Sequence, residues 1–183
     1  MGSKPMSLAL SADDIVEFHA ARLLLLFRLC GTSNRIDGLT KMAKLDFFVR
    51  YPDFFQVAKD AVSPSSNARS TSASAAMATE SAMVRHHYGP WDKRYYQVLA
   101  HLESRQLIEV TKDKNAYRLT LTPSGKSRAD LIAKTASFAS VVSRMKEVKR
   151  VFGDKSGDYL KCLIYRLFDT EVSQKKMGKV IKK

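Results

Sequence analysis

The stretch "HLESRQLIEVTKDKNAYRLTLTPSGKSRADL", residues 101–131, decides the fold of this 183-residue chain. The first residues of this stretch are the end of a helix with one apolar side. Two short apolar stretches, 107–111 and 116–121, then flank the polar letters "KDKN". Alternation of apolar and polar residues around such a turn predicts a β-hairpin. Thr122 and Pro123 follow as the cap and first residue of a further helix, because proline is favoured at the first helical position.

Helices are predicted on both sides of this hairpin from apolar residues that recur at helical spacing. The first begins at Ser11, which is followed by Asp13 and Asp14 in the first turn, and Gly31 ends it. The row Leu23–Phe27 is apolar nearly all round, so this helix is expected at the centre of the fold. The other predicted helices span 39–51, 53–62, 91–106, a continuous stretch from 122 to 152, and 159–168.

Helices followed by a two-stranded hairpin and a further helix give the order of a winged helix-turn-helix domain, in which 91–106 takes the place of the third helix. The sequence therefore predicts a mainly α chain with a small β-hairpin, built as a winged helix-turn-helix with an N-terminal helical layer and a C-terminal helical extension. The predicted segments are a disordered N-terminus (1–10), N-terminal helices (11–62), a flexible Ser/Ala loop (63–76), the third helix and wing (77–128), the helical extension (129–172) and a basic tail (173–183). The loop carries no aromatic or large aliphatic residue that could order it.

The net charge of +13 indicates a polyanionic partner. DNA or RNA is the first candidate, and an acidic protein or a membrane surface is the second. The excess is uneven, since residues 1–104 hold 12 Lys/Arg and 10 Asp/Glu, whereas residues 105–183 hold 19 and 8. Nearly all of the positive charge thus belongs to the second half of the chain.

The third helix and the wing are the predicted DNA-binding elements. Basic and amide side chains on an exposed helix can contact phosphates and, through Arg and Gln, base edges in a major groove. The alternatives are an ordinary solvated face and a face that meets protein. The predicted DNA-binding residues are Lys93, Arg94, Gln97, His101 and Arg105 on the helix and Lys112, Lys114 and Arg118 on the wing.

The helices after the hairpin carry more apolar surface than a minimal winged-helix core requires. Packing within the chain explains most of it, and a seam for a partner helix is the competing interpretation. The predicted partner-interface residues are Phe138, Met145, Val148 and Phe152.

No enzyme, cofactor or metal site is expected. His86 and His87 are adjacent and lack further ligands at zinc spacing, and Cys30 and Cys162 lie in apolar helical patterns typical of buried thiols. Gly125-Lys126-Ser127 lacks the upstream glycine of a phosphate-binding loop. The apolar run Leu23–Phe27 is too short to span a membrane, and the acids near the start do not suit a leader, so a cytoplasmic protein is expected.

Four segments resemble the small middle component of bacterial three-component ATPase systems, including the Lamassu-type anti-phage defence systems. They are "GLTKMAKLDFFVRYPDFF" (38–55), "MVRHHYGPWDKRYYQVLAHLESRQLIEV" (83–110), "GDYLKCLIYRLFD" (157–169) and "KMGKVI" (176–181). The resemblance implies a non-catalytic winged-helix subunit that joins an SMC/Rad50-like ATPase to a nuclease-like effector and helps the complex recognise foreign double-stranded DNA. The alternative is a free-standing, dimeric winged-helix transcriptional regulator.

Overall fold

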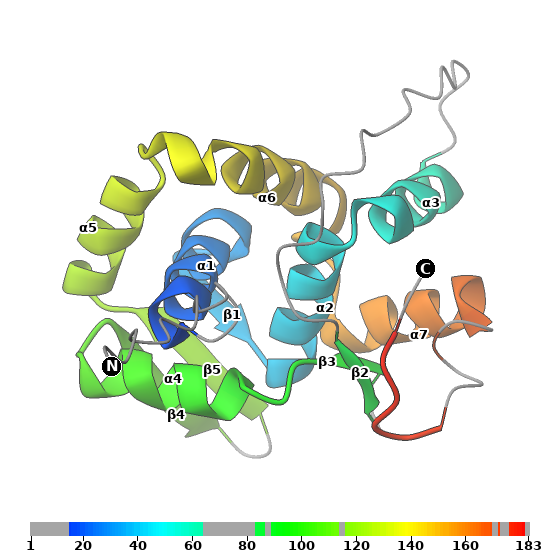
Figure 1. Cartoon of the computed structure of the whole chain (residues 1–183), viewed down its shortest axis with the longest axis horizontal. Coiled ribbons are helices and arrows are strands. Elements are labelled where there is room, and N and C mark those ends of the chain that lie inside the picture. The colour runs from blue at the N-terminus through cyan, green and yellow to red at the C-terminus, as the bar shows by residue number, and fades with distance from the viewer. Residues whose placement is uncertain are drawn as a thin grey trace, which may run out of the picture.

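The chain is mainly helical and carries a small antiparallel sheet, as expected (Figure 1). The computed structural model describes residues 15–63, 83–86, 89–113, 116–169, 172 and 176–181. The predicted disordered N-terminus (1–10) and the Ser/Ala loop, apart from Ser63, lie outside these residues. The helices are α1 (Val16–Cys30), α2 (Leu39–Arg50), α3 (Pro52–Val62), α4 (Tyr95–Ser104), α5 (Pro123–Ile132), the 3-10 turn η2 (Ala136–Phe138), α6 (Ala139–Phe152) and α7 (Gly157–Leu167).

The predicted hairpin is confirmed as β4 (Ile108–Asp113) and β5 (Ala116–Leu121). A strand of three residues that the sequence did not predict, β1 (Arg35–Asp37), pairs antiparallel with β5, so the strand order is β1-β5-β4. Ile36 lies opposite Leu119, and both side chains are buried. The strand that follows α1 is thereby tied to the hairpin that follows α4.

Helix α1 occupies the centre of the molecule, as its apolar row predicts (Figure 1). The side chains from Leu23 to Phe27 are all buried, because α2, α4, α5, α6 and β5 pack around the helix. A helix that is apolar on every side is stable in water only when other elements cover it completely.

The expected continuous helix from 122 to 152 is wrong, since the chain breaks between α5 and α6. Thr135 adopts an extended conformation, with φ −79° and ψ 137°, and its hydroxyl donates to the carbonyl of Ile132 at 2.7 Å. Ser and Thr compete in this way for backbone groups and so favour helix ends. The break lets the chain turn between α5 and α6, so that both helices pack on α1.

Helices α2, α3 and α7 form a second group beside α1 (Figure 1). Aromatic side chains join this group to α6, and the ring centroids of Phe48 and Phe152 lie 4.6 Å apart. A second small sheet, β2 (Val84–His86) with β3 (Gly89–Trp91), lies next to α2. Trp91 therefore belongs to a strand, and α4 starts four residues later than the sequence predicts.

The described part of the predicted basic tail, 176–181, packs along β2. The amide of Arg85 donates to the carbonyl of Lys179, and the amide of Ile181 donates to the carbonyl of Met83, each at 2.8 Å. The side chain of Ile181 is completely buried. The segment therefore stabilises the core around Met83.

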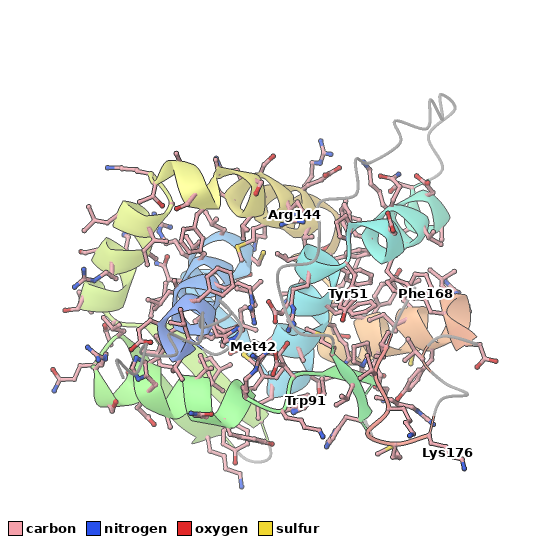
Figure 2. The ribbon with its side chains drawn as sticks, in the orientation of Figure 1. Met42, Tyr51, Trp91, Arg144, Phe168 and Lys176 are labelled. Atoms are coloured by element: carbon pink, nitrogen blue, oxygen red, sulfur yellow. The ribbon has the colours of Figure 1, made fainter. Side chains whose placement is uncertain are left out.

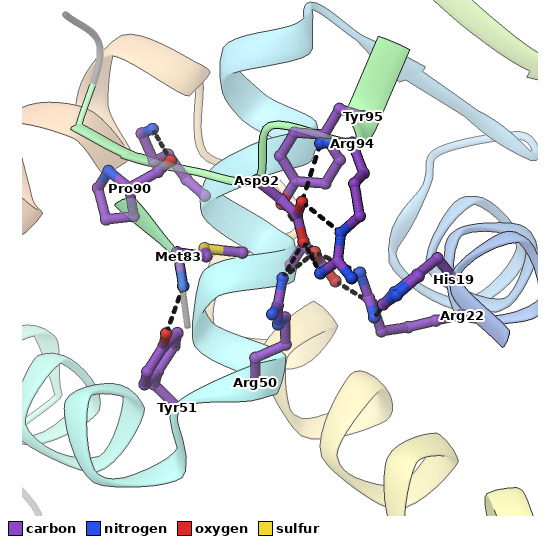
Figure 3. Close-up of polar contacts among 11 residues, drawn as sticks. His19, Arg22, Arg50, Tyr51, Met83, Pro90, Asp92, Arg94 and Tyr95 are labelled. Carbon is purple, nitrogen blue, oxygen red and sulfur yellow. Dashed lines mark hydrogen bonds and ion pairs between the residues drawn. The ribbon is translucent and has the colours of Figure 1, made fainter. Parts of the chain in front are cut away.

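A buried ion pair joins α1, α2 and α4 (Figure 3). Arg22 donates to both carboxylate oxygens of Asp46, at 2.9 and 3.3 Å, and Tyr95 donates its hydroxyl to the same carboxylate at 2.7 Å. The side chains of Arg22 and Asp46 are 2% and 0% exposed. His19 Nδ1 lies 2.9 Å from Arg22 and must accept, since a guanidinium can only donate.

Replacement of Asp46 by Ala should lower the free energy of unfolding by about 3–5 kcal/mol, because Arg22 would stay buried without its counter-charge. The exposed pair Arg118–Asp113 provides a matched control, and Asp113→Ala should cost about 0–1 kcal/mol. Urea unfolding followed by circular dichroism measures both. Equal losses in the two variants would show that the buried pair does not hold the three helices together.

Candidate nucleic-acid interface

The outward side of α4 carries the residues predicted to contact DNA, although only Gln97 and His101 lie within the helix itself. Lys93 and Arg94 precede its first residue, and Arg105 follows its last. Lys93, Gln97 and Arg105 are exposed, whereas His101 is half-buried. The structure therefore spreads the predicted helix residues over α4 and the turns at both of its ends.

Arg94 is held by Asp92 rather than directed to solvent (Figure 3). Its side chain donates to the two carboxylate oxygens at 3.0 and 2.8 Å, and its amide donates to the same carboxylate at 3.0 Å. Arg50 of α2 also donates to Asp92, at 2.8 Å. Burial alone would raise the pKa of Asp92, but the hydrogen bonds from Arg94 and Arg50 hold it well below its usual range. Arg94 thus fixes the start of α4.

The hairpin places Lys112 and Arg118 on adjacent strands. The ammonium of Lys112 lies 5.8 Å from the ring centroid of Tyr117, and Arg118 pairs with Asp113. Lys114, also predicted to bind DNA, lies outside the described residues. Of the predicted wing cations that the structure describes, Lys112 is therefore the one not paired with a carboxylate.

The surface made by α4 and the hairpin carries little net charge. Residues 92–121 contain six Lys/Arg and four Asp/Glu. Glu103 on α4 accepts a hydrogen bond from the amide of Val110 at 3.3 Å, so one of these acids links α4 to β4. The excess positive charge of the second half of the chain lies mainly elsewhere.

Tyr96 is an exposed aromatic residue on α4 that the sequence analysis did not single out. Its side chain is 62% exposed, and its ring centroid lies 5.9 Å from that of Trp91. The helical spacing of neighbouring buried residues, Tyr95 and Leu99, was the signal that would have placed Tyr96 on the outer side. An aromatic ring beside Gln97 can stack on a base or pack against a protein.

The predicted partner seam after the hairpin is wrong for three of its four residues. Met145, Val148 and Phe152 are completely buried in the core of the chain, because they face α1 and α2. Phe138 is half-buried and stacks on Phe18, with 6.1 Å between the ring centroids. Intramolecular packing, the competing interpretation, accounts for these side chains.

The described residues contain no group of three or more His, Cys, Asp or Glu side chains that could hold a metal ion. His86 stacks on Trp91 with 5.2 Å between ring centroids, and His87 lies outside the described residues. Burial raises the pKa of the Cys30 thiol to about 12, whereas Cys162 is exposed, contrary to its apolar helical context. Within the described ranges, no helix is both long and apolar enough to cross a membrane.

A buried lysine fixes β3 against α2. The ammonium of Lys44 donates to the carbonyl of Pro90 at 2.9 Å, and its side chain is completely buried. Burial, with a smaller contribution from the positive charge of Lys161, lowers the pKa of Lys44 to about 7. Gly89, at φ +92°, lets the chain pass close to this side chain. Lys44 and Asp92 together hold the segment that leads into α4.

Comparisons with known proteins identify no relative. No protein-family model matches the chain, and no curated protein or solved structure shows significant similarity to it.

The free energy of unfolding should increase with pH above about 7 through Lys44. Between its folded pKa of about 7 and the ordinary value of 10.5, the unfolded chain binds one more proton than the folded chain. Stability attributable to this group should thus rise by up to about 1.4 kcal/mol per pH unit in that window and be constant below it.

Comparison of the chain with the Lys44→Met variant in urea unfolding at pH 6, 7, 8 and 9 isolates this effect. The wild-type chain should gain stability relative to that variant as the pH rises above 7. The exposed Lys126→Met variant serves as the control and should keep a constant difference from wild type. A difference between wild type and Lys44→Met that does not change from pH 6 to 9 would contradict the lowered pKa.

Proposed function

We propose that this chain is a non-catalytic, DNA-contacting winged-helix subunit of an SMC/Rad50-like ATPase complex that defends bacteria against phage or plasmid DNA. In this proposal, the chain bridges the ATPase and a nuclease-like effector in the cytoplasm. It supplies binding surfaces, and the chemistry belongs to its partners.

The observation that carries the winged-helix part is the connection α4–β4–β5, closed by the pairing of β1 with β5. This arrangement supports a recognition helix followed directly by a two-stranded wing and anchored through β1 to the strand after α1. The sheet is short, and the described strand residues next to the turn, 111–113 and 116–118, are exposed, where a neighbouring DNA backbone could be reached.

One feature departs from a simple helix-turn-helix motif. Such motifs join their two helices by a turn of about 3–4 residues. Here α2 and α4 are separated by 44 residues, 51–94, which include α3 and the β2–β3 sheet. The hairpin and not the connection between the helices therefore supports the winged-helix assignment.

The segments that carry the resemblance to the ATPase-system component come together in space, which supports the subunit assignment. Segment 38–55 forms α2 and the start of α3, and 157–169 contains α7, which packs on α2. Segment 176–181 is hydrogen-bonded to the first strand of 83–110. They form one continuous part of the molecule beside α1 (Figure 1).

The buried ionisable groups support a binding role over a catalytic one. Arg22, Asp46 and Tyr95 satisfy one another within the core, and burial together with the charge of Asp46 raises the pKa of Tyr95 well above its ordinary value. A general acid or base needs access to a substrate and a pKa near the working pH. These groups instead hold three helices together.

Affinity purification of the tagged chain from its native host, with nuclease treatment, tests the subunit assignment. We expect a large coiled-coil ATPase and a nuclease-like protein to co-purify in fixed ratio. Nuclease treatment removes proteins joined only through DNA, so that the recovered contacts are direct. Recovery of the chain alone as a symmetric dimer would contradict the proposal and favour the transcriptional regulator.

A further inference from the structure

Two rows of basic side chains lie on α5 and α6. Lys126 and Lys134 are each four residues from Asp130, which places the three one helical turn apart on and just beyond α5. Lys146 and Arg150 are likewise four residues apart on α6. Residues 123–152 contain seven Lys/Arg and two Asp/Glu, against six and four in residues 92–121.

Contacts to α1 bring these two rows to the same place. Asp130 accepts a hydrogen bond from Arg28, in the last turn of α1, at 2.7 Å. Lys149, next to Arg150 on α6, donates to the carbonyls of Cys30 and Gly31 at 3.2 and 2.7 Å. Both rows therefore flank the C-terminal end of α1. The name α1-end surface is used below for Arg28, Lys126, Lys134, Lys146 and Lys149.

The two carboxylates near this surface, Asp130 and Glu147, are each paired with a cation. Arg28 pairs with Asp130, and its hydrogen bond, with the fields of Lys126 and Lys134, lowers the pKa of that carboxyl. Glu147 pairs with Lys59 of α3 at 2.7 Å. Lys126, Lys134 and Lys146 are exposed, and none of them forms an ion pair with any residue that the structure describes.

The helix dipole explains part of this surface, including Lys134 just beyond the end of α5, but not the positions of Lys126 and Lys146. Lys149 and Arg28 stand at the C-terminal end of α1, where the helix dipole favours cations. Lys126 lies in the fourth position of α5, near the positive end of that dipole, and Lys146 lies in the middle of α6. Lys126 and Lys134 lie close enough to Asp130 to lower the pKa of its carboxyl, whereas Lys146 forms no ion pair with any described residue.

We infer that the α1-end surface binds the phosphate backbone of duplex DNA and supplies more of the salt-dependent affinity than α4 and the hairpin. The inference rests on the proposed DNA contact and assigns it to a different surface. Flexible ammonium groups suit phosphates, and they neutralise charge without reading base sequence. In Figure 1, α6 and α4 lie on opposite sides of α1, whereas α5 begins beside the end of α4. There Thr122 donates to the carbonyls of Gln106 and Leu107, so the two surfaces adjoin near Lys126 and are well separated at Lys146.

Two triple variants with equal charge change test the inference on the full chain. One is Lys126→Gln/Lys134→Gln/Lys146→Gln on the α1-end surface, and the other is Lys93→Gln/Arg105→Gln/Lys112→Gln on α4 and the hairpin. All six lysine and arginine side chains are exposed, so neither variant removes a buried contact. Fluorescence anisotropy with a labelled 20-base-pair duplex of arbitrary sequence, from 50 to 200 mM salt, gives affinity and salt dependence.

The α1-end variant should lose up to about 2.7 from the slope of log K against log salt, and roughly a hundredfold in affinity at 100 mM if all three contacts are lost. In the α4 variant, the slope of log K against log salt should fall by less than half of the loss seen in the α1-end variant. An equal or larger loss in the α4 variant would overturn the inference while leaving the proposed DNA contact intact.

Absence of duplex binding by the wild-type chain at 50 mM salt would instead refute the DNA contact itself, and with it the inference. Fluorescein-labelled poly-glutamate, measured in parallel, identifies an acidic protein as the ligand class in that case. Unchanged circular dichroism spectra and urea midpoints in both variants are the control for folding.

Discussion

The ion pair between Arg22 and Asp46 is the interaction on which the arrangement of helices depends. Two charges buried in a core are costly to dehydrate, and they are stable only where their hydrogen-bonding groups are satisfied. Asp46 meets this condition by accepting from Arg22 and from the hydroxyl of Tyr95, which belong to α1 and α4 (Figure 3). The pair therefore fixes three helices in one register, which apolar contacts alone specify less sharply.

The same principle extends from the core to the segment that leads into α4. Asp92 is held by Arg50 of α2 and by Arg94, and Lys44 of α2 donates to the carbonyl of Pro90. Lys44 and Arg50 are six residues apart on α2, and Figure 2 labels Met42 and Tyr51 near the two ends of this helix. Helix α2 thus positions α4 through polar contacts, while the exposed cations of α5 and α6 remain outside that network.

The sequence predicted those features that depend on local periodicity. The apolar row Leu23–Phe27 indicated a central helix, and alternation around "KDKN" predicted the β4–β5 hairpin. It could not predict β1, since three residues carry too short a pattern and pair with a strand more than 80 residues away. The break at Thr135 was missed because the apolar spacing continues on both sides of it.

The candidate site was predicted less well for a physical reason. Charge and helical spacing do not reveal which cation has a partner, and Arg94 is bound by Asp92 in the turn between β3 and α4. Apolar spacing likewise does not separate a partner seam from the chain's own core, so Met145 and Phe152 fitted both interpretations. The most direct measurement is a titration of the ¹⁵N-labelled chain with a short duplex, followed by amide chemical shifts. The account predicts that the shifts concentrate around Lys126, Lys134 and Lys146; shifts confined to α4 and the hairpin, or none, would contradict it.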